Sequence, residues 1–333
     1  MATIKDIAQK LKVSVSTVSK GLNGGSDISE ELRQQILDAA VEMGYQTKHS
    51  KKVENRKLCL MIENMAYQMP EDFGYDIVLG FKQIANREKW NVDVVEVTRE
   101  METADRYDTF LLKNGYSGAF LVGFALDDSW TPQLKTTRMP TVMLDNSIAY
   151  NLNSCEVGTD SREGVSLAVD HLYRLGHRRI ALISGFTDSN VSKERYQAFL
   201  EAMEQRKLAV DEKLVGFGYY IPETAAYFVK DFLERGATGI ICGNDLIAQG
   251  VLQECSRLGY RVPEDVSVVG YDDIRLAEEL TPKLTTIRQE RNMLGRQAFM
   301  DLYSLIHSIP VARTVLRPRL VERESTGPAR GER

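Results

Sequence analysis

Apolar positions near the start of the chain recur at the spacing of a helix. Three such sets follow one another within residues 1–47, and each predicts one amphipathic helix. Residues that favour helix N-caps precede the sets at Thr3, Ser14 and Ser29, and Gly44 is placed to end the third helix. The predicted inward-facing positions are Ile4, Ile7, Ala8, Leu11, Val18, Leu22, Leu32, Ile36, Ala39, Ala40 and Met43.

From residue 58 onward, short apolar runs alternate with helical patterns. This alternation predicts parallel sheets with helices on both faces. The apolar runs are too many for one small sheet, so we expect two similar lobes. We interpret Asn151–Gly158 as a crossover segment between them. The predicted strands are Leu58–Ile62, Val92–Val97, Ala119–Val122, Thr141–Leu144, Ile180–Ser184, Gly239–Cys242 and Val266–Gly270, with helices such as Tyr75–Glu88, Glu163–Leu175 and Val191–Arg206 between them.

The second predicted helix exposes small polar side chains. Its outer face holds Ser16, Ser19 and Lys20, and a tight turn separates it from the first helix. In a helix-turn-helix, the second helix enters the major groove of DNA. Small hydroxyls allow close approach there, Lys20 is free to reach a guanine edge or a phosphate, and Val15 can touch a thymine methyl. A generic three-helix bundle without DNA is the alternative.

Charge is unevenly distributed along the chain. The whole sequence has a net charge of −5, whereas residues 1–57 hold ten Lys/Arg and seven Asp/Glu, a balance of +3. Five of these cations lie within Lys48–Lys57. A basic head on an acidic body indicates that a polyanion binds the head. On charge alone, a solvated linker explains the segment equally well.

Several classes of protein are disfavoured by the sequence. The longest apolar run, Leu58–Ile62, is far shorter than a membrane span, and the N-terminus has no apolar signal region, so we expect a cytoplasmic protein without a membrane partner. The cysteines are widely spaced, which predicts buried reduced thiols with no metal, cofactor or disulfide. These cysteines are Cys59, Cys155, Cys242 and Cys255.

Polar side chains recur where predicted strands of the body end. Ligands in parallel sheets bind beyond the carboxyl ends of strands, and the cleft between two lobes is the expected pocket. Carboxylates, an amide and a guanidinium beside aromatic rings suit the hydroxyls of a sugar or polyol. For each polar residue alone, a helix cap or strand-end hydrogen bond is the alternative. The strand-end residues are Asp145, Asn244, Asp245, Asp272 and Asp273, joined by Arg195 and by the aromatic Phe73, Tyr75 and Tyr220.

Two histidines raise the question of catalysis. His177 follows Gly176 at the end of a predicted helix, where a partly positive ring would interact favourably with the helix dipole. We therefore interpret His171 and His177 as structural residues.

The head carries a recognisable set of residues. Ile4-Lys5-Asp6-Ile7-Ala8, then Val13-Ser14 and Thr17-Val18-Ser19-Lys20, then Leu22-Asn23-Gly24 and Met43-Gly44-Tyr45 resemble the head of the lactose-repressor (LacI/GalR) family of bacterial transcription regulators. The resemblance implies that Val15, Ser16 and Lys20 read bases. It also implies that Thr17, Ser19 and Asn23 lie toward the DNA backbone, while Ala8 and Val18 pack. Ser14 is also assigned to the DNA-binding surface.

The resemblance extends through most of the body. It implies an α/β fold with a three-helix helix-turn-helix head and a two-lobed, periplasmic-binding-protein-like body of two doubly wound parallel sheets. It also implies that Asp145, Arg195, Asn244 and Asp272 contact a sugar effector, with Tyr220 as an aromatic platform. The motifs are Gly158-x-Asp160, Gly164, Ala168, His171-Leu172, Leu175-Gly176-His177, Ile180-Ala181, Cys242-Gly243-Asn244-Asp245, Val262-Pro263-Glu264-Asp265, Val268-x-Gly270-Tyr271-Asp272-Asp273 and Leu284-Thr285-Thr286-Ile287.

The linker departs from the family pattern. The proline and the hinge leucine of the family are absent, and Val53 is the only apolar candidate for a residue that wedges into the minor groove. Lys51 and Lys52 remain as candidates for phosphate contacts, so we expect strongly salt-dependent DNA binding with little bending.

The expected domains are a head at 1–47, a basic linker at 48–57, a body at 58–328 and a tail at 329–333. Within the body, the N-lobe is expected at about 58–158 with 289–316, and the C-lobe at about 159–288 with 317–328. Two heads on a two-fold body would read a pseudo-palindromic operator in double-stranded DNA, so a homodimer is expected. The tail lacks a heptad repeat, so no tetramers are expected.

Other functions are weighed against a regulator. No complete Gly-x-Gly-x-x-Gly, phosphate-loop or His-Glu-x-x-His motif is present, which disfavours an enzyme. The helix-turn-helix head disfavours a pure ligand carrier. A regulator that responds to a partner protein, or to no ligand, stays open. The sequence does not identify the effector or the operator, nor whether the ligand releases or promotes DNA binding.

Overall fold

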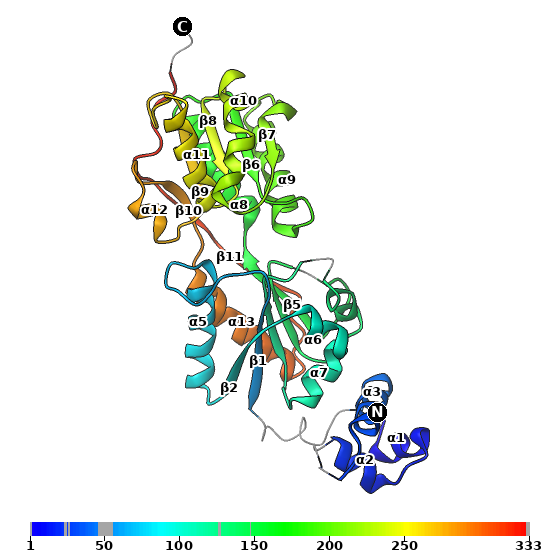
Figure 1. The fold of residues 1–333 in the computed structure, drawn as a ribbon. Coiled ribbons are helices and arrows are strands. Elements are labelled where there is room, and N and C mark those ends of the chain that lie inside the picture. Colours follow the sequence, from blue (N-terminus) through cyan, green and yellow to red (C-terminus); the bar gives the residue numbers. More distant parts are fainter. Residues whose placement is uncertain are drawn as a thin grey trace. The chain divides into compact units, whose positions relative to one another are not determined.

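The chain forms two compact units, each built from separate segments (Figure 1). The computed structural model describes residues 2–22, 25, 27–45, 56–125, 128–146 and 148–330. Unit 1 comprises residues 1–65, 76–157 and 292–314, and unit 2 comprises residues 66–75, 158–291 and 315–333. The polypeptide therefore passes between the units at five points, and neither unit is a continuous stretch of sequence.

The head contains the three predicted helices, α1 (Ile4–Leu11), α2 (Val15–Leu22) and α3 (Glu30–Met43). Local hydrogen bonds set their ends. The Thr3 side chain accepts from the Asp6 amide while the Asp6 carboxylate accepts from the Thr3 amide, which forms a capping box. Ser29 caps α3, and Gly44 ends it with a φ of 66°. The small core that joins the helices consists of Ile7, Ala8, Val18, Ile36, Ala39 and Ala40.

Unit 1 holds a six-stranded sheet in the order β11-β5-β4-β3-β1-β2. The pairs from β2 to β5 are parallel. The strands are β1 (Lys57–Ile62), β2 (Asn91–Glu96), β3 (Ala119–Val122), β4 (Thr141–Leu144), β5 (Ser154–Thr159) and β11 (Arg313–Leu316). The helices are α5 (Phe73–Arg87), α6 (Arg99–Ala104), α7 (Tyr107–Lys113) and α13 (Arg291–Ile306), with a 3₁₀ turn at Thr131–Lys135.

The two faces of this sheet are both buried, and successive residues of its strands pack on opposite faces. Cys59 and Met61 join a core with Tyr107 of α7 and with Trp130. On the opposite face, Phe81 of α5 stacks on Phe120 of β3 at 5.2 Å and meets Phe299 of α13 edge-on at 5.9 Å. Burial on both faces explains why these strands are continuous apolar runs.

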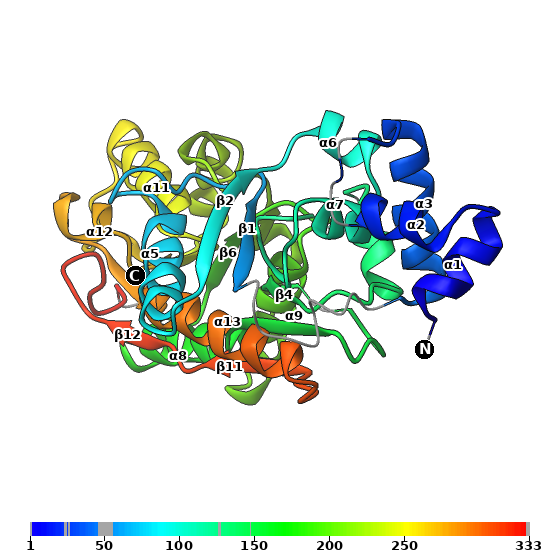
Figure 2. The ribbon, with the colours of Figure 1, turned by 90° about the horizontal axis from the view of Figure 1, so that it is seen from below.

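Helices α5 and α13 lie side by side in both views of the ribbon (Figures 1 and 2). Two glycines show that their backbones are in close contact. A Cβ atom on Gly80 would lie 2.0 Å from the Asn292 carbonyl oxygen. A Cβ atom on Gly295 would lie 1.9 Å from the Ile77 carbonyl oxygen. Glycine is required at both positions because no side chain fits between the two helices.

Unit 2 holds the second six-stranded sheet, in the order β12-β10-β9-β8-β6-β7. Only the edge strand β12 is antiparallel to its neighbour, β10. The strands are β6 (Ile180–Ser184), β7 (Val215–Phe217), β8 (Gly239–Cys242), β9 (Ser267–Asp272), β10 (Thr285–Arg288) and β12 (Arg319–Val321). The helices are α8 (Ser161–Arg174), α9 (Asn190–Gln205), α10 (Val229–Glu234), α11 (Asp245–Arg257) and α12 (Leu276–Glu279), with 3₁₀ turns at Glu212–Leu214 and Pro222–Tyr227.

Two apolar layers enclose this second sheet. Val165 and Leu172 of α8 and Phe199 of α9 pack on one face. Phe232 of α10 and Val251 of α11 pack on the other. The predicted α/β class with two doubly wound sheets is confirmed.

The predicted crossover at Asn151–Gly158 is confirmed, because the chain passes from unit 1 to unit 2 after Val157. The same stretch also contains most of β5, a strand that was not predicted and whose residues are all buried. Its sequence SCEVGT mixes small and charged residues, so it does not read as an apolar run. Strands β7, β10, β11 and β12 were also not predicted, because they are short and, unlike the equally short β3, are not continuous apolar runs.

His177 is structural, but it is not a charged helix cap. Burial lowers its pKa, so the ring is neutral at pH 7. The ring nitrogen Nδ1 lies 3.0 Å from the Thr238 hydroxyl, and Nε2 lies 3.0 Å from the Gly327 carbonyl oxygen. His171 Nε2 similarly lies 2.9 Å from the Thr326 hydroxyl. Both histidines therefore attach the C-terminal segment to unit 2.

The four cysteines are buried and free. Burial raises the pKa of Cys59 and of Cys255 to about 12, which keeps these thiols protonated and unreactive. In the part of the chain that the structure describes, no helix has the length and apolar character of a membrane span.

Candidate DNA-binding and effector sites

Helix α2 presents the predicted reading surface of the head. Val18 and Gly21 face the core, and a Cβ atom on Gly21 would lie 2.7 Å from Ile36, so α2 and α3 are in close contact there. The opposite face is exposed at Val15 (45% exposed), Ser16 and Lys20, while Thr17 and Ser19 are half-buried. The exposed face therefore contains the three residues expected to read bases.

Ser14 has a structural role at the start of α2. Its Oγ accepts from the Thr17 amide at 3.0 Å, and the two hydroxyls lie 2.8 Å apart. The hydroxyls of Ser14 and Thr17 are thus partly engaged within the head. Asn23, Lys51, Lys52 and Val53, also predicted to bind DNA, lie outside the described residues.

Lys20 is not free, which corrects the expectation from the sequence. Its ammonium group forms an ion pair with the Asp27 carboxylate, and this contact lowers the pKa of Asp27. Both side chains are about half exposed, at 48% and 58%. An exposed pair of this kind contributes little stability, so a phosphate or base can replace Asp27 as the partner of Lys20.

Lys20→Ala is expected to weaken binding to a specific duplex about tenfold, because one charge-assisted contact per head is lost. Lys10→Ala removes an exposed lysine of α1 that pairs with Glu42, and it serves as the matched control. Fluorescence anisotropy with a labelled duplex measures both variants. Equal affinities of the two variants would contradict the assignment of Lys20 to the DNA surface.

Arg195 and Asp272 come together in unit 2, as the sequence predicts. Arg195, on α9, is 5% exposed, and its guanidinium lies 3.7 Å above the Tyr271 ring and donates to the Gly243 carbonyl oxygen at 2.5 Å. The Asp272 carboxylate at the end of β9 lies 3.9 Å from the Arg195 guanidinium. Burial raises the pKa of Asp272 to about 6, although Arg195 lowers it. Asp272 is therefore predominantly ionised at pH 7, with one buried cation beside it.

Gln289 belongs to the same group. Its amide Nε2 donates to Asp272 Oδ1 at 2.7 Å, and Gln289 is 3% exposed. Sequence reasoning missed it, although Gln289 follows β10 directly. The rule that found Asp272 would have found Gln289 as well, had TTIR been recognised as a strand.

Tyr220 lies across the end of β6. Its ring occupies the space that a side chain on Gly185 would need, with a Cβ–Cζ distance of 2.1 Å. The Tyr220 hydroxyl lies 2.7 Å from Ser192 Oγ on α9, and Phe186 meets the ring edge-on at 6.4 Å. The rings of Tyr220 and Phe186 form an aromatic surface in unit 2, and Ser192 contacts the Tyr220 hydroxyl. The sequence did not indicate Phe186 or Ser192.

The other predicted effector residues have clear local roles. Asn244 caps α11, since its side chain accepts from the Ile247 amide at 2.8 Å, and it donates to the Tyr220 carbonyl oxygen at 3.4 Å. Phe73 has the Arg291 guanidinium 5.9 Å above its ring. Tyr75 is half-buried, and Asp145 follows β4 with a φ of 55°. The helix-cap alternative therefore applies to Asn244.

Three carboxyl groups interact near the carboxyl end of β1 in unit 1. Burial, the Asp128 charge and the Glu102 charge raise the pKa of Glu63 to about 8. Folded protein therefore keeps this proton up to about pH 8, whereas the unfolded chain loses it near the ordinary pKa of 4.5. Since the folded state binds more protons across that window, Glu63 makes stability fall as the pH rises from 4.5 to 8.

Glu63→Gln is expected to remove this dependence. At pH 8.5 the variant should be more stable than the wild type by up to about 1 kcal/mol, a limited gain because solvent screens a half-buried group. At pH 4 the two proteins should be alike. Urea titrations at both pH values measure the difference, and a variant that is less stable at pH 8.5 would contradict the assignment.

Comparison with known proteins bears on both sites. Residues 3–48 match the family model described as bacterial regulatory proteins, lacI family. Residues 169–326 match the periplasmic binding protein-like domain. The HTH-type transcriptional repressor PurR of Actinobacillus pleuropneumoniae serotype 3 (strain JL03) is 30% identical over 327 residues, covering 97% of this chain and 95% of the relative. The chain belongs to the LacI family.

Solved structures support this LacI-family assignment along the chain. The transcriptional regulator CelR–cellobiose complex has a TM-score of 0.74 at 27% identity, covering 98% of this chain and 100% of that one. A LacI family transcriptional regulator from Enterococcus faecium with bound ribose has a TM-score of 0.68 at 26% identity, covering 82% of this chain and 100% of that one. The resemblance recognised in the sequence is confirmed, and this LacI-family chain is a DNA-binding regulator and not an enzyme.

Proposed function

We propose that this LacI-family chain is a transcriptional repressor whose operator affinity is controlled by a small sugar or a related metabolite. The buried group of Arg195, Asp272 and Gln289 in unit 2 carries this proposal. A buried cation, a carboxylate and an amide, with the Tyr220 ring in the same unit, can donate to and accept from several hydroxyl groups. Phe73, Tyr75, Asp145 and Asn244 are the other proposed effector residues.

The relatives support the two halves of the proposal separately. PurR, which covers nearly the same length, is named a repressor. Two similar regulators were solved with cellobiose and with ribose. We propose by analogy that this chain also takes a carbohydrate.

The proposed working form is a cytoplasmic homodimer on a pseudo-palindromic operator. One helix-turn-helix reads about one half-site, so a two-fold pair of heads reads two. Within each chain we propose a head at 1–47, a linker at 48–57 and an effector-binding body at 58–328. An effector alters DNA affinity only if it binds the two conformations of the body unequally.

Selection of bound duplexes from a random pool tests the DNA half of the proposal. The full chain should enrich one two-fold symmetric sequence, and metabolites added to the pool should change the yield. Absence of any enriched sequence would overturn the proposed function. Thermal unfolding with sugars tests the other half, since a ligand at 100 times its Kd stabilises the folded state by about 2.7 kcal/mol. If no sugar raises the unfolding temperature of the body and only a partner protein does, a regulator controlled by that partner would be favoured.

Asp272→Ala is expected to abolish the effector response while leaving operator affinity within about twofold of the wild type, because the carboxylate lies in unit 2 and not in the head. Arg195→Ala should do the same. Asp170→Ala, which removes a carboxylate of α8 paired with Arg206, is the matched control. The measurement is operator affinity with and without the sugar identified by thermal shift. A normal response of Asp272→Ala would show that the effector residues are wrongly assigned.

A further inference from the structure

The turn that follows β9 has an unusual backbone. Asp272 has a φ of 106° and Asp273 a φ of 52°. Residues other than glycine rarely adopt a positive φ. Two consecutive aspartates with positive φ therefore cost free energy. Such a turn persists only where neighbouring groups hold it. The contacts of Asp273 are therefore important for Asp272, the proposed effector residue.

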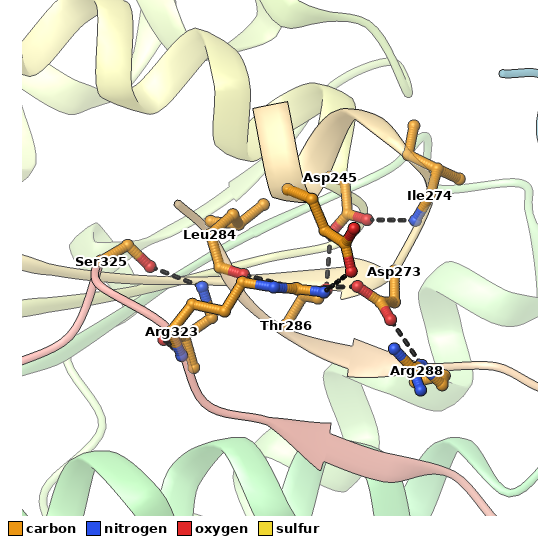
Figure 3. Close-up of polar contacts among 10 residues, drawn as sticks. Asp245, Asp273, Ile274, Leu284, Thr286, Arg288, Arg323 and Ser325 are labelled. Atoms are coloured by element: carbon orange, nitrogen blue, oxygen red, sulfur yellow. Dashed lines mark hydrogen bonds and ion pairs between the residues drawn. The ribbon is translucent and has the colours of Figure 1, made fainter. Parts of the chain in front are cut away.

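Two arginines hold the side chain of Asp273 (Figure 3). Its side chain is 4% exposed. Oδ2 accepts from Arg288 Nε at 2.5 Å, and Oδ1 lies 2.8 Å from Arg323 Nη1. The carboxylate thus lies between a residue of β10 and a residue of the segment that follows β12.

Arg323 is itself fixed from several directions. Its side chain is 10% exposed. Nη1 donates to the Leu284 carbonyl oxygen at 2.8 Å, and Nη2 lies 3.1 Å from Glu278 Oε1. Its backbone amide donates to Thr285 Oγ1 at 2.9 Å. A guanidinium with this many partners cannot move without breaking contacts with the second sheet, so it acts as a rigid anchor.

The other end of the turn is held by Asp245. Its carboxylate accepts from the Ile274 amide at 2.8 Å and from the Thr286 hydroxyl at 2.5 Å. Anchors therefore act on residues 273 and 274, directly after Asp272. On the other side of the turn, the Asp272 carboxylate meets Gln289 at 2.7 Å and Arg195 at 3.9 Å.

We infer that Arg323 is a positioning residue for the effector site: by holding the Asp273 carboxylate, it keeps the turn in the conformation that presents Asp272 beside Arg195 and Gln289. The inference rests on the proposed function, because it assigns Asp272 to the effector. A segment 51 residues beyond Asp272 in sequence would then set effector affinity without touching the ligand.

A simpler role for Arg323 is to neutralise the buried charge of Asp273. Removing one partner of a buried pair leaves an uncompensated charge and destabilises the fold. Loss of stability in Arg323→Met therefore does not separate the two roles. The double variant Arg323→Met/Asp273→Asn does, because it removes the buried carboxylate charge together with its buried partner, while Arg288, the other partner, is 41% exposed and can be solvated.

The first measurement needs no ligand. In the full-length chain with labelled aspartate, the Cα and carbonyl chemical shifts of Asp272 and Asp273 report the backbone dihedrals. Arg323→Met should displace the shifts of both residues, and the double variant should keep Asp272 displaced while most of the lost thermal stability returns. Arg206→Met is the matched control, since Arg206 is a 17%-exposed arginine of unit 2 paired with Asp170. Wild-type shifts of Asp272 in the Arg323 variants would overturn the inference.

The second measurement is calorimetric titration with cellobiose and with D-ribose. For a sugar that binds the wild type, Kd should rise at least tenfold in Arg323→Met and in the double variant, and less than twofold in Arg206→Met. If the double variant recovers both the wild-type Kd and the wild-type stability, Arg323 serves only to neutralise the Asp273 carboxylate, and the inference is wrong. If neither sugar binds the wild type, the result counts against the proposed sugar effector, and the chemical shifts decide the positioning role alone.

Discussion

Ile36→Ala is expected to abolish specific DNA binding while leaving the body folded. Ile36 is fully buried in the small core of the head, against Gly21 of α2. Truncating a buried isoleucine costs about 2–5 kcal/mol, which is comparable to the stability that so small a core provides. If one head in ten or one in a hundred stays folded, the apparent affinity falls roughly ten- to hundredfold.

Anisotropy with the selected duplex and thermal unfolding of the full chain together check this result. The thermal transition of the body should be unchanged, because Ile36 belongs to the head core. Ile36→Val, which removes one methyl group and typically costs about 0.5–1.5 kcal/mol, is the control and should retain most of the binding. Wild-type affinity of Ile36→Ala would show that α2 does not depend on this core for its position.

Gly295→Ala is expected to lower the Tm of unit 1 strongly. The added methyl would lie 1.9 Å from the Ile77 carbonyl oxygen and 2.7 Å from the Phe81 amide nitrogen, both backbone atoms of α5. Since backbone cannot rotate away like a side chain, the two helices must separate. Overpacking of this kind costs about 3 kcal/mol, which exceeds the gain of up to about 1 kcal/mol from the better helix propensity of alanine.

For a unit of this size, the cost corresponds to a decrease in Tm of roughly 6–12 °C. Calorimetry of the full chain measures it. Met300→Ala changes an exposed residue of the same helix and should shift the transition by little. Gly80→Ala, whose methyl would meet the Asn292 carbonyl oxygen from the other helix, should behave like Gly295→Ala. A Tm unchanged in both glycine variants would contradict the close crossing.

The head could be read from the sequence because its signals are local. A cap residue and the amide it accepts from are three positions apart, as in Thr3 with Asp6 and Ser29 with Leu32. The spacing of Ile7, Val18 and Ile36 fixes which faces meet. What this reasoning missed was the partner of Lys20, because Asp27 lies beyond the end of α2 and no periodic pattern indicates its direction.

In the body, prediction succeeded where strands are continuous apolar runs and failed where pairing depends on distant segments. TTIR, RTVL and RLV are short and partly polar, and they become strands because neighbours far away in sequence provide their hydrogen bonds. Asp272 was found because it ends a recognisable strand. Gln289, which contacts Asp272, was missed because the strand before it was not recognised. Arg323, which contacts Asp273, was missed because no local rule links residues 50 positions apart.

The discontinuous composition of unit 1 has a consequence for biosynthesis. Phe299 of α13 and the edge strand β11 emerge from the ribosome only after nearly all of unit 2, since unit 1 stops at residue 157 and resumes at residue 292. At elongation rates of about 5–20 residues per second, this interval lasts roughly 7–27 s. During that time the nascent first sheet lacks α13, one of its covering helices. Phe81 and Phe120 therefore lack the Phe299 ring that packs against Phe81 in the folded protein. We therefore expect this apolar face to be the part of the nascent chain most prone to aggregation until α13 emerges.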